Sequence, residues 1–136
     1  MSVLGVPELI AALDKMVVAA TAANLRIINR SEAVVNANIK KQFTGAHQRG
    51  KPTTSSPGSP PDVVTGTLRR SVTSTTPVLH GFMATGSVYP SAVYARIQEL
   101  GGRGLPARPY TAPGGQSSLP AIQQIALEEW GQAVRS

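Results

Sequence analysis

Residues 8–44 contain neither glycine nor proline, and this uninterrupted stretch constrains the fold more than any other feature of the chain. Apolar residues recur in it at spacings of three and four, which is the repeat of one helical face. These residues are Leu9, Leu13, Met16, Ala20, Ala23 and Ile27. Pro7 suits a first helical turn, where its missing N–H costs little. We therefore predict a helix over residues 7–43, about 55 Å long at ~1.5 Å per residue.

A helix of that length exceeds the diameter of a globule built from 136 residues. Either the helix bends, or one end projects and packs against another subunit. The apolar fraction is 41%, only 4% of the residues are aromatic, and alanine and valine supply much of the rest. Such a core is thin, and association with neighbouring subunits stabilises thin cores. We therefore expect an oligomer.

Residues 44–61 have a very different composition, with four prolines, three glycines and many serines and threonines. A segment of this kind cannot bury a core, so we predict a flexible loop. Basic residues lie at its start and within its first half, namely Lys40, Lys41, Arg49 and Lys51. They would suit the phosphates of a DNA channel or an acidic partner surface. The alternative is a basic loop that only meets solvent.

The second half of the chain predicts a small sheet and two helices. Residues 72–78 are rich in threonine and valine, and residues 82–88 are expected to return as an antiparallel partner after a turn at 79–81. A short helix is predicted over residues 91–100, closed by Gly101, and a last helix from Ser117 or Ser118 with Pro120 in its first turn. The expected fold is a single α+β domain over residues 1–136, with a long N-terminal helix, a small antiparallel sheet, a short helix and a C-terminal helix.

Two features of the predicted last helix carry specific expectations. Trp130 is the largest apolar side chain of the chain, and we expect it in the core. The adjacent acids Glu128 and Glu129 are expected to face solvent.

Residues typical of catalysis or metal binding form no recognisable pattern. Cysteine is absent, which excludes disulfides and thiolate chemistry. His47 and His80 have no partner at metal-ligand spacing, and neither a nucleophile elbow nor a phosphate-binding glycine loop is present. We predict no enzyme activity, no cofactor, no metal site, no signal peptide and no membrane span. The formal charge of +6 favours a polyanionic neighbour such as DNA.

Glu99 is the acid of greatest interest, because it lies at the end of the predicted short helix. A negative charge at a helix C-terminus is unfavourable, so a compensating arginine is expected. Candidates are Arg96, Arg103 and Arg108. The pair would form either within the chain or across a subunit boundary, and we favour the boundary.

Three segments, in this order, carry a resemblance to a known family. They read PPDVVTGTLRRSV at residues 60–72, YARIQELGG at 94–102 and LPARPYTAP at 105–113. With a helix at each end, this pattern resembles the neck or tail-component family of long-tailed double-stranded DNA phages, typified by a head-tail joining protein of a Hong Kong lambdoid phage. The matching positions are Thr65, Gly66, Leu68, Arg69, Ser71, Tyr94, Glu99, Gly101, Arg108, Pro109, Tyr110 and Pro113.

The resemblance implies a structural virion protein, assembled in the host cytoplasm, that forms a homo-oligomeric ring at the head-to-tail junction. The ring would join the head-side connector or stopper to the tail terminator or tail tube, close to the DNA channel and without reading base sequence. Candidate contacts between subunits or rings are Arg69, Arg70, Tyr94, Glu99, Arg108 and Tyr110. Two alternatives remain: a tail terminator ring that caps the tail tube, and a basic module that binds nucleic acid.

Overall fold

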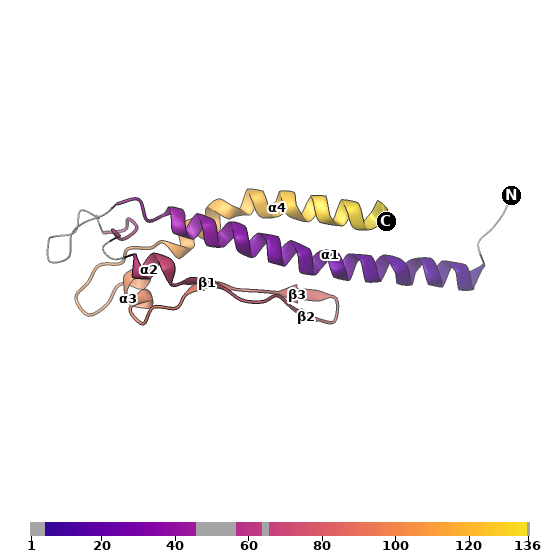
Figure 1. Cartoon of the computed structure of the whole chain (residues 1–136), viewed down its shortest axis with the longest axis horizontal. Helices are drawn as coiled ribbons and strands as arrows, with labels where there is room; N and C mark the ends of the chain where they lie inside the picture. The colour runs from indigo at the N-terminus through magenta and orange to yellow at the C-terminus, as the bar shows by residue number, and fades with distance from the viewer. Residues whose placement is uncertain (1–4, 46–56, 64–65, 136) are drawn as a thin grey trace.

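The computed structural model describes residues 5–45, 57–63 and 66–135, and Figure 1 shows an elongated molecule built along one long helix. The elements are α1 (Val6–Lys41), α2 (Thr67–Arg70), β1 (Val72–Ser74), β2 (Val78–His80), β3 (Met83–Thr85), β4 (Val88–Pro90), α3 (Ala95–Leu100) and α4 (Thr111–Arg135). The predicted α+β fold, with its long first helix, small antiparallel sheet, short helix and C-terminal helix, is confirmed.

Helices α1 and α4 lie side by side and run antiparallel (Figure 1). They approach closely where Gly114 meets Ile39, because a Cβ atom at Gly114 would lie only 2.7 Å from the Cα atom of Ile39. Nearby, the amide of Asn38 donates to the hydroxyl of Ser118 over 2.8 Å, and Ser118 donates to the carbonyl of Gly114. A small residue therefore sets the distance between the two helices.

An ion-pair cluster joins the same helices further along. The Nε atom of Arg26 lies 2.7 Å from the carboxylate of Glu129, and Arg30 bridges Glu129 and Glu128 at 3.1 Å and 3.0 Å. The hydrogen bond from Arg26 is the main reason that the pKa of Glu129 is lowered. The expectation that both acids face solvent is wrong for Glu129, whose side chain is 9% exposed, because it lies against α1.

The sheet region is a long hairpin that packs along α1. Strand β1 pairs with β4 and β2 pairs with β3, both antiparallel as predicted, but the turn lies at residues 81–82 rather than 79–81. Between the two paired regions, the outgoing side of the hairpin has one more residue than the returning side. This extra residue interrupts the ladder of hydrogen bonds between the strands. Pro77, which has no N–H to donate, lies in this interruption.

A buried carboxylate holds the hairpin to α1. Glu32 is buried, and one of its oxygens accepts hydrogen bonds from the Thr75 hydroxyl at 3.0 Å and the Ser87 backbone N–H at 2.9 Å. Gly86 lies directly over this carboxylate, and a Cβ atom there would also come within 2.7 Å of Ile28. We call Glu32, Thr75, Gly86 and Ser87 the hairpin clamp.

Helix α4 begins at Thr111, several residues before the predicted start at Ser117 or Ser118. The prediction was wrong because the N-terminus of α4 is capped by a side chain from elsewhere in the chain, as described below. Pro120 consequently lies inside the helix rather than in its first turn. It is exposed, and its lost hydrogen bond is a cost that the helix tolerates.

Two smaller predictions also need correction. The short helix α3 begins at Ala95 instead of Ser91, although Gly101 ends it with a positive φ of 77° as expected. Trp130 is 49% exposed rather than in the core, and its indole N–H donates to Asn24. Most of the predicted flexible loop, residues 46–56, lies outside the described residues. Near the described end of this segment, the N–H of Gly58 donates to the carbonyl of Ala107 over 2.8 Å.

Candidate interaction surfaces

The three resemblance segments meet in one compact region at the end of the molecule where α2 and α3 lie (Figure 1). We call residues 57–63, 66–72 and 94–113 the motif lobe. Its core consists of Ile39, Phe43, Leu68, Val72, Ala95 and Tyr110. The rings of Phe43 and Tyr110 lie 5.0 Å apart at 53°, a tilted arrangement that is favourable for aromatic pairs. Each of the three segments thus contributes at least one side chain to the same core.

Glu99 caps the N-terminus of α4. Its carboxylate accepts hydrogen bonds from the backbone N–H groups of Tyr110, Thr111 and Ala112, at 2.8 Å, 3.0 Å and 3.2 Å. These groups have no partner inside the helix, and a negative charge is favourable at that end of the helix. Glu99 therefore replaces the local serine cap that the sequence predicts, and it joins the second resemblance segment to the third.

The environment of Glu99 shifts its pKa in a definite direction. Partial burial disfavours the charged form, but hydrogen bonds from Thr111, Tyr110 and Ala112 outweigh it, and the pKa of Glu99 is lowered from its ordinary value. No arginine pairs with Glu99 among the ion pairs of the described residues. The expected arginine partner is thus replaced by backbone N–H groups, and a role for Glu99 at a subunit boundary stays a prediction.

We expect Glu99→Gln to destabilise the protein by about 1 kcal/mol in urea unfolding, the usual cost of a lost cap. Because the pKa is lower in the folded than in the unfolded chain, the contribution of Glu99 is fully present above the ordinary value of 4.5 and is lost as the pH falls through the folded pKa. The difference between wild type and variant should therefore shrink below about pH 4.5. Arg103→Gln, at an exposed charged residue of the same lobe, is the matched control, and an equal effect of both variants would contradict the capping role.

Tyr110 and Arg108 are less accessible than the sequence suggests. Tyr110 is completely buried, and burial raises the pKa of its hydroxyl. Tyr110 is therefore corrected from an interface candidate to a core residue of the lobe. The backbone N–H of Arg108 donates to Gln98 over 2.7 Å, and its Nε atom is buried without a hydrogen-bond partner among the described residues.

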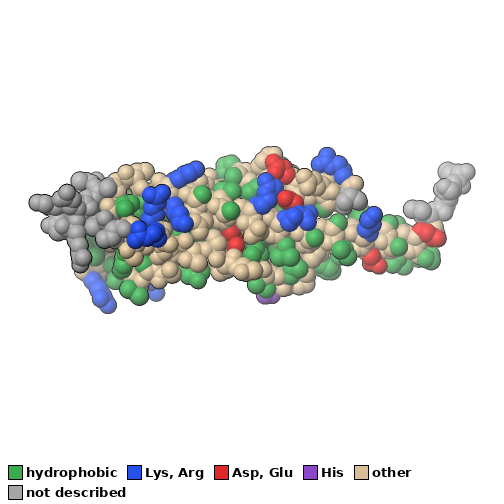
Figure 2. Space-filling view, in the orientation of Figure 1, with side chains coloured by type: hydrophobic (Ala, Val, Ile, Leu, Met, Phe, Trp, Pro, Cys, Tyr) green, Lys and Arg blue, Asp and Glu red, His purple; other side chains and the backbone are tan. Residues whose placement is uncertain are grey.

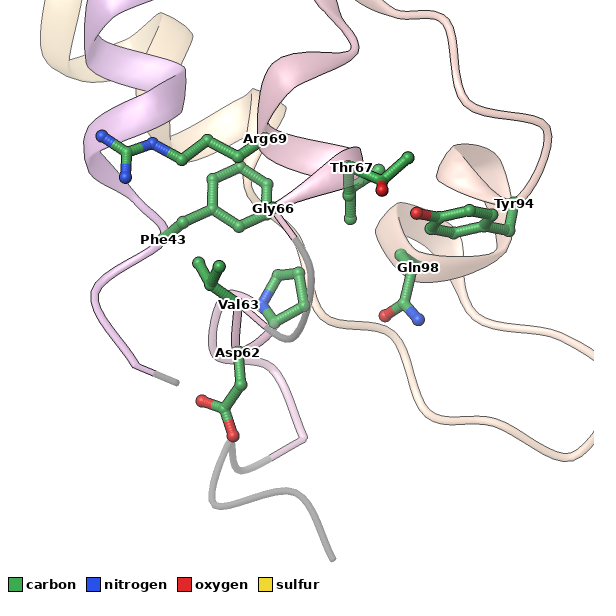
Figure 3. A pocket seen from close by; sticks show the side chains of 10 residues that line it. Phe43, Asp62, Val63, Gly66, Thr67, Arg69, Tyr94 and Gln98 are labelled. Atoms are coloured by element: carbon green, nitrogen blue, oxygen red, sulfur yellow. The ribbon is translucent and has the colours of Figure 1, made fainter. Parts of the chain in front are cut away.

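The other interface candidates lie on the surface of the motif lobe. Arg69 and Arg70 of α2 are exposed, and Tyr94 is partly exposed. Arg69 and Tyr94 line a pocket of about 120 Å³ together with Phe43 and Gln98 (Figure 3). Sites for drug-sized ligands usually measure about 300–1,000 Å³, so this pocket does not suit a cofactor.

Basic side chains gather at the lobe end of the molecule, as the face in Figure 2 illustrates. Lys40 and Lys41 occupy the last turn of α1, where they also complement the helix dipole. They lie at the same end as Arg69 and Arg70 of α2 (Figure 1). Arg49 and Lys51 of the predicted basic loop lie outside the described residues. Their placement toward DNA stays a prediction.

Large apolar side chains remain uncovered on three elements. Those of α1 are Val6, Leu9, Ile10, Leu13, Met16, Val17 and Val18, those of the hairpin tip include Phe82 and Met83, and those of α4 are Leu119, Leu127, Trp130 and Val134. Contiguous apolar patches on a soluble protein mark surfaces that meet another macromolecule. Sequence periodicity identified the α1 stripe, but it could not tell which part of that stripe the chain itself covers.

The described ranges also bear on metal binding and membrane insertion. Residues 5–45, 57–63 and 66–135 contain no group of three or more histidine or acidic side chains that could hold a metal ion. None of the helices in those ranges combines the length and apolar character that a membrane span requires. The apolar surfaces and the basic lobe are the candidate interaction surfaces considered below. No protein-family model, curated protein or solved structure matches the chain.

Proposed function

We propose that this chain is a structural subunit of the phage neck. Copies of it would form a ring at the head-to-tail junction of the virion, around the DNA channel, and join the head-side connector or stopper to the tail. The resemblance that suggests this role consists of three short segments, each of which is weak alone. The resemblance supports the role more strongly if the three segments form one structural unit.

The observation that most supports the proposal is that the three segments build one lobe. Leu68 from the first, Ala95 from the second and Tyr110 from the third lie in the same core. Glu99 of the second segment is hydrogen-bonded to the start of α4 in the third. Their convergence in one core is what a single structural unit requires, and it supports the proposal.

Two further features agree with a ring subunit. The uncovered apolar faces of α1 and α4 need partners, and in a cyclic ring each subunit uses two different patches. The described residues of the lobe end include basic side chains but no exposed aromatic cluster for stacking on bases, which suits sequence-independent contact with phosphates. A tail terminator ring shares both features, so the two proposals differ in position within the particle.

Arg69 and Arg70 offer a better test of the ring contacts than Glu99, whose loss would also disturb the start of α4. The double change Arg69→Glu and Arg70→Glu should lower the joining of heads to tails at least tenfold while far-UV circular dichroism stays unchanged. Arg103→Glu, an exposed arginine elsewhere in the lobe, is the matched control. Joining would be counted by electron microscopy in an extract that lacks the wild-type subunit.

The purified protein tests the proposal as a whole. We expect rings by mass measurement, and binding to isolated tail tubes or head connectors. A label on the C-terminus should lie at the neck, whereas a label at the end of isolated tails would favour the terminator. A stable monomer that ignores tubes and connectors would overturn the proposal. A monomer whose DNA binding falls steeply with salt would support the nucleic-acid module instead.

A further inference from the structure

The first three turns of α1 present an apolar stripe that no other described part of the chain covers. Trp130 of α4 contacts Asn24, and α4 ends at Arg135, whereas α1 continues to Val6 and extends past the end of α4 (Figure 1). The side chains of this α1 stripe are Val6, Leu9, Ile10, Leu13 and Met16, all between 49% and 69% exposed. Their spacing places them on one face of the helix.

The same helical face is buried further along α1. Leu9, Leu13 and Met16 continue at helical spacing to Ala23 and Ile27, both of which are buried within the chain. The stripe is therefore one continuous surface, half of which is covered by the chain itself. The covered half of the stripe packs against an apolar surface. A molecule that covers the free half should therefore also present an apolar surface.

Helix α4 carries a second uncovered stripe. Its members are Leu119, Leu127, Trp130 and Val134, which are between 49% and 69% exposed. They are spaced by eight, three and four residues, so they share one face of the helix. The face of α4 that is buried in the chain carries Ile125 and Ala133 instead. The molecule thus has two separate apolar helical faces without partners in the described residues.

We propose that the α1 stripe of one subunit docks against the α4 stripe of a second copy of this chain. Packing of one helix against another suits both surfaces. Charge complements the fit, because Asp14 borders the α1 stripe, whereas Arg135 ends the α4 stripe. The first turns of α1 carry Glu8 and Asp14 against Lys15, whereas the chain as a whole is basic, so the start of α1 is attracted to a neighbouring copy.

The contact joins the α1 stripe of one copy to the α4 stripe of another. Each pair of copies therefore still has one free α1 stripe and one free α4 stripe. Repetition produces a closed ring when the rotation allows, and an open filament otherwise. The contact itself rests only on the two stripes, whereas closure into a ring at the neck rests on the proposed function. Experiments on the contact and on the neck role can therefore fail separately.

Cross-linking tests the contact directly, since the chain has no cysteine of its own. A mixture of Leu13→Cys and Leu127→Cys proteins, treated with a short bismaleimide, should give a cross-linked dimer, and each variant alone should give little. The double variant should give a ladder of higher oligomers. Val93→Cys, at a 99% exposed residue next to the lobe, is the control and should not cross-link to Leu13→Cys. Dimers of Leu13→Cys alone, or no cross-links at all, would overturn the proposal.

A charge placed on the stripe provides an independent measurement. Leu13→Asp should weaken self-association at least tenfold in sedimentation experiments, with unchanged circular dichroism at 222 nm. Ala11→Asp, an exposed alanine on the opposite face of the same turns, should have little effect. Assembly of Leu13→Asp as strong as that of wild type would overturn the contact. Oligomers that cross-link as expected but ignore heads and tails would support the contact and contradict the neck proposal.

Discussion

Replacing Gly114 with alanine should destabilise the protein by about 1–3 kcal/mol, the range seen when a packed interior is overfilled. The new Cβ atom would lie 2.7 Å from the Cα atom and 2.8 Å from the backbone nitrogen of Ile39. These are backbone atoms, so no side chain can rotate away. Helices α1 and α4 would have to separate along their whole contact. Urea unfolding followed by circular dichroism measures the change.

The adjacent glycine provides a control with the opposite sign. A Cβ atom at Gly115 would meet nothing within 4 Å, outside its own helix and chain neighbours. Alanine is favoured over glycine inside a helix by up to about 1 kcal/mol. Gly115→Ala should therefore stabilise the protein slightly. If both alanines had the same effect, the close approach of α1 to α4 at Gly114 would be refuted.

Gly86→Ala is expected to loosen the hairpin on α1, at a cost of about 1–3 kcal/mol, because a buried carboxylate would lose hydrogen-bond partners. The new methyl group would collide with the Glu32 carboxylate and would lie 2.7 Å from Ile28. Glu32 would then lose its hydrogen bonds from Thr75 and Ser87. Hydrogen exchange should report faster exchange of the amides of the hairpin than of those in the middle of α4.

Ser87→Ala is the matched control for the hairpin clamp. Ser87 donates to Glu32 through its backbone N–H, which alanine retains. An exposed substitution of this kind usually changes stability by less than about 0.5 kcal/mol. Equal destabilisation by Gly86→Ala and Ser87→Ala would show that the packing at Gly86 is not the cause.

The sequence predicts the elements that depend on local pattern. Helix α1 was predicted over residues 7–43 and is found at Val6–Lys41, because helical spacing and the absence of glycine and proline act within a few residues. Gly101 was correctly identified as the end of the short helix, since a positive φ is a local demand. The antiparallel hairpin followed from its threonine and valine content.

The predictions that failed depend on contacts between distant segments. The start of α4 is capped by Glu99, which no local rule could reveal. Glycine has a low helix propensity, so Gly114 and Gly115 argue against a helix at this point of the sequence. Gly114 is nevertheless needed there, because a side chain would collide with Ile39. The hairpin clamp was missed entirely, because nothing near Glu32 in the sequence indicates that it reaches Thr75 and Ser87.

The pairing of α1 with α4 has a consequence for how the chain acquires its structure. Arg26 and Glu129 are 103 positions apart, so almost the whole chain must be synthesised before α4 can cover α1. Contacts of such long sequence separation form slowly, because a large loop must close first. Newly made chains therefore expose a long apolar helix for some time. At high expression they will tend to co-aggregate, and slower synthesis at lower temperature should raise the yield of folded subunits.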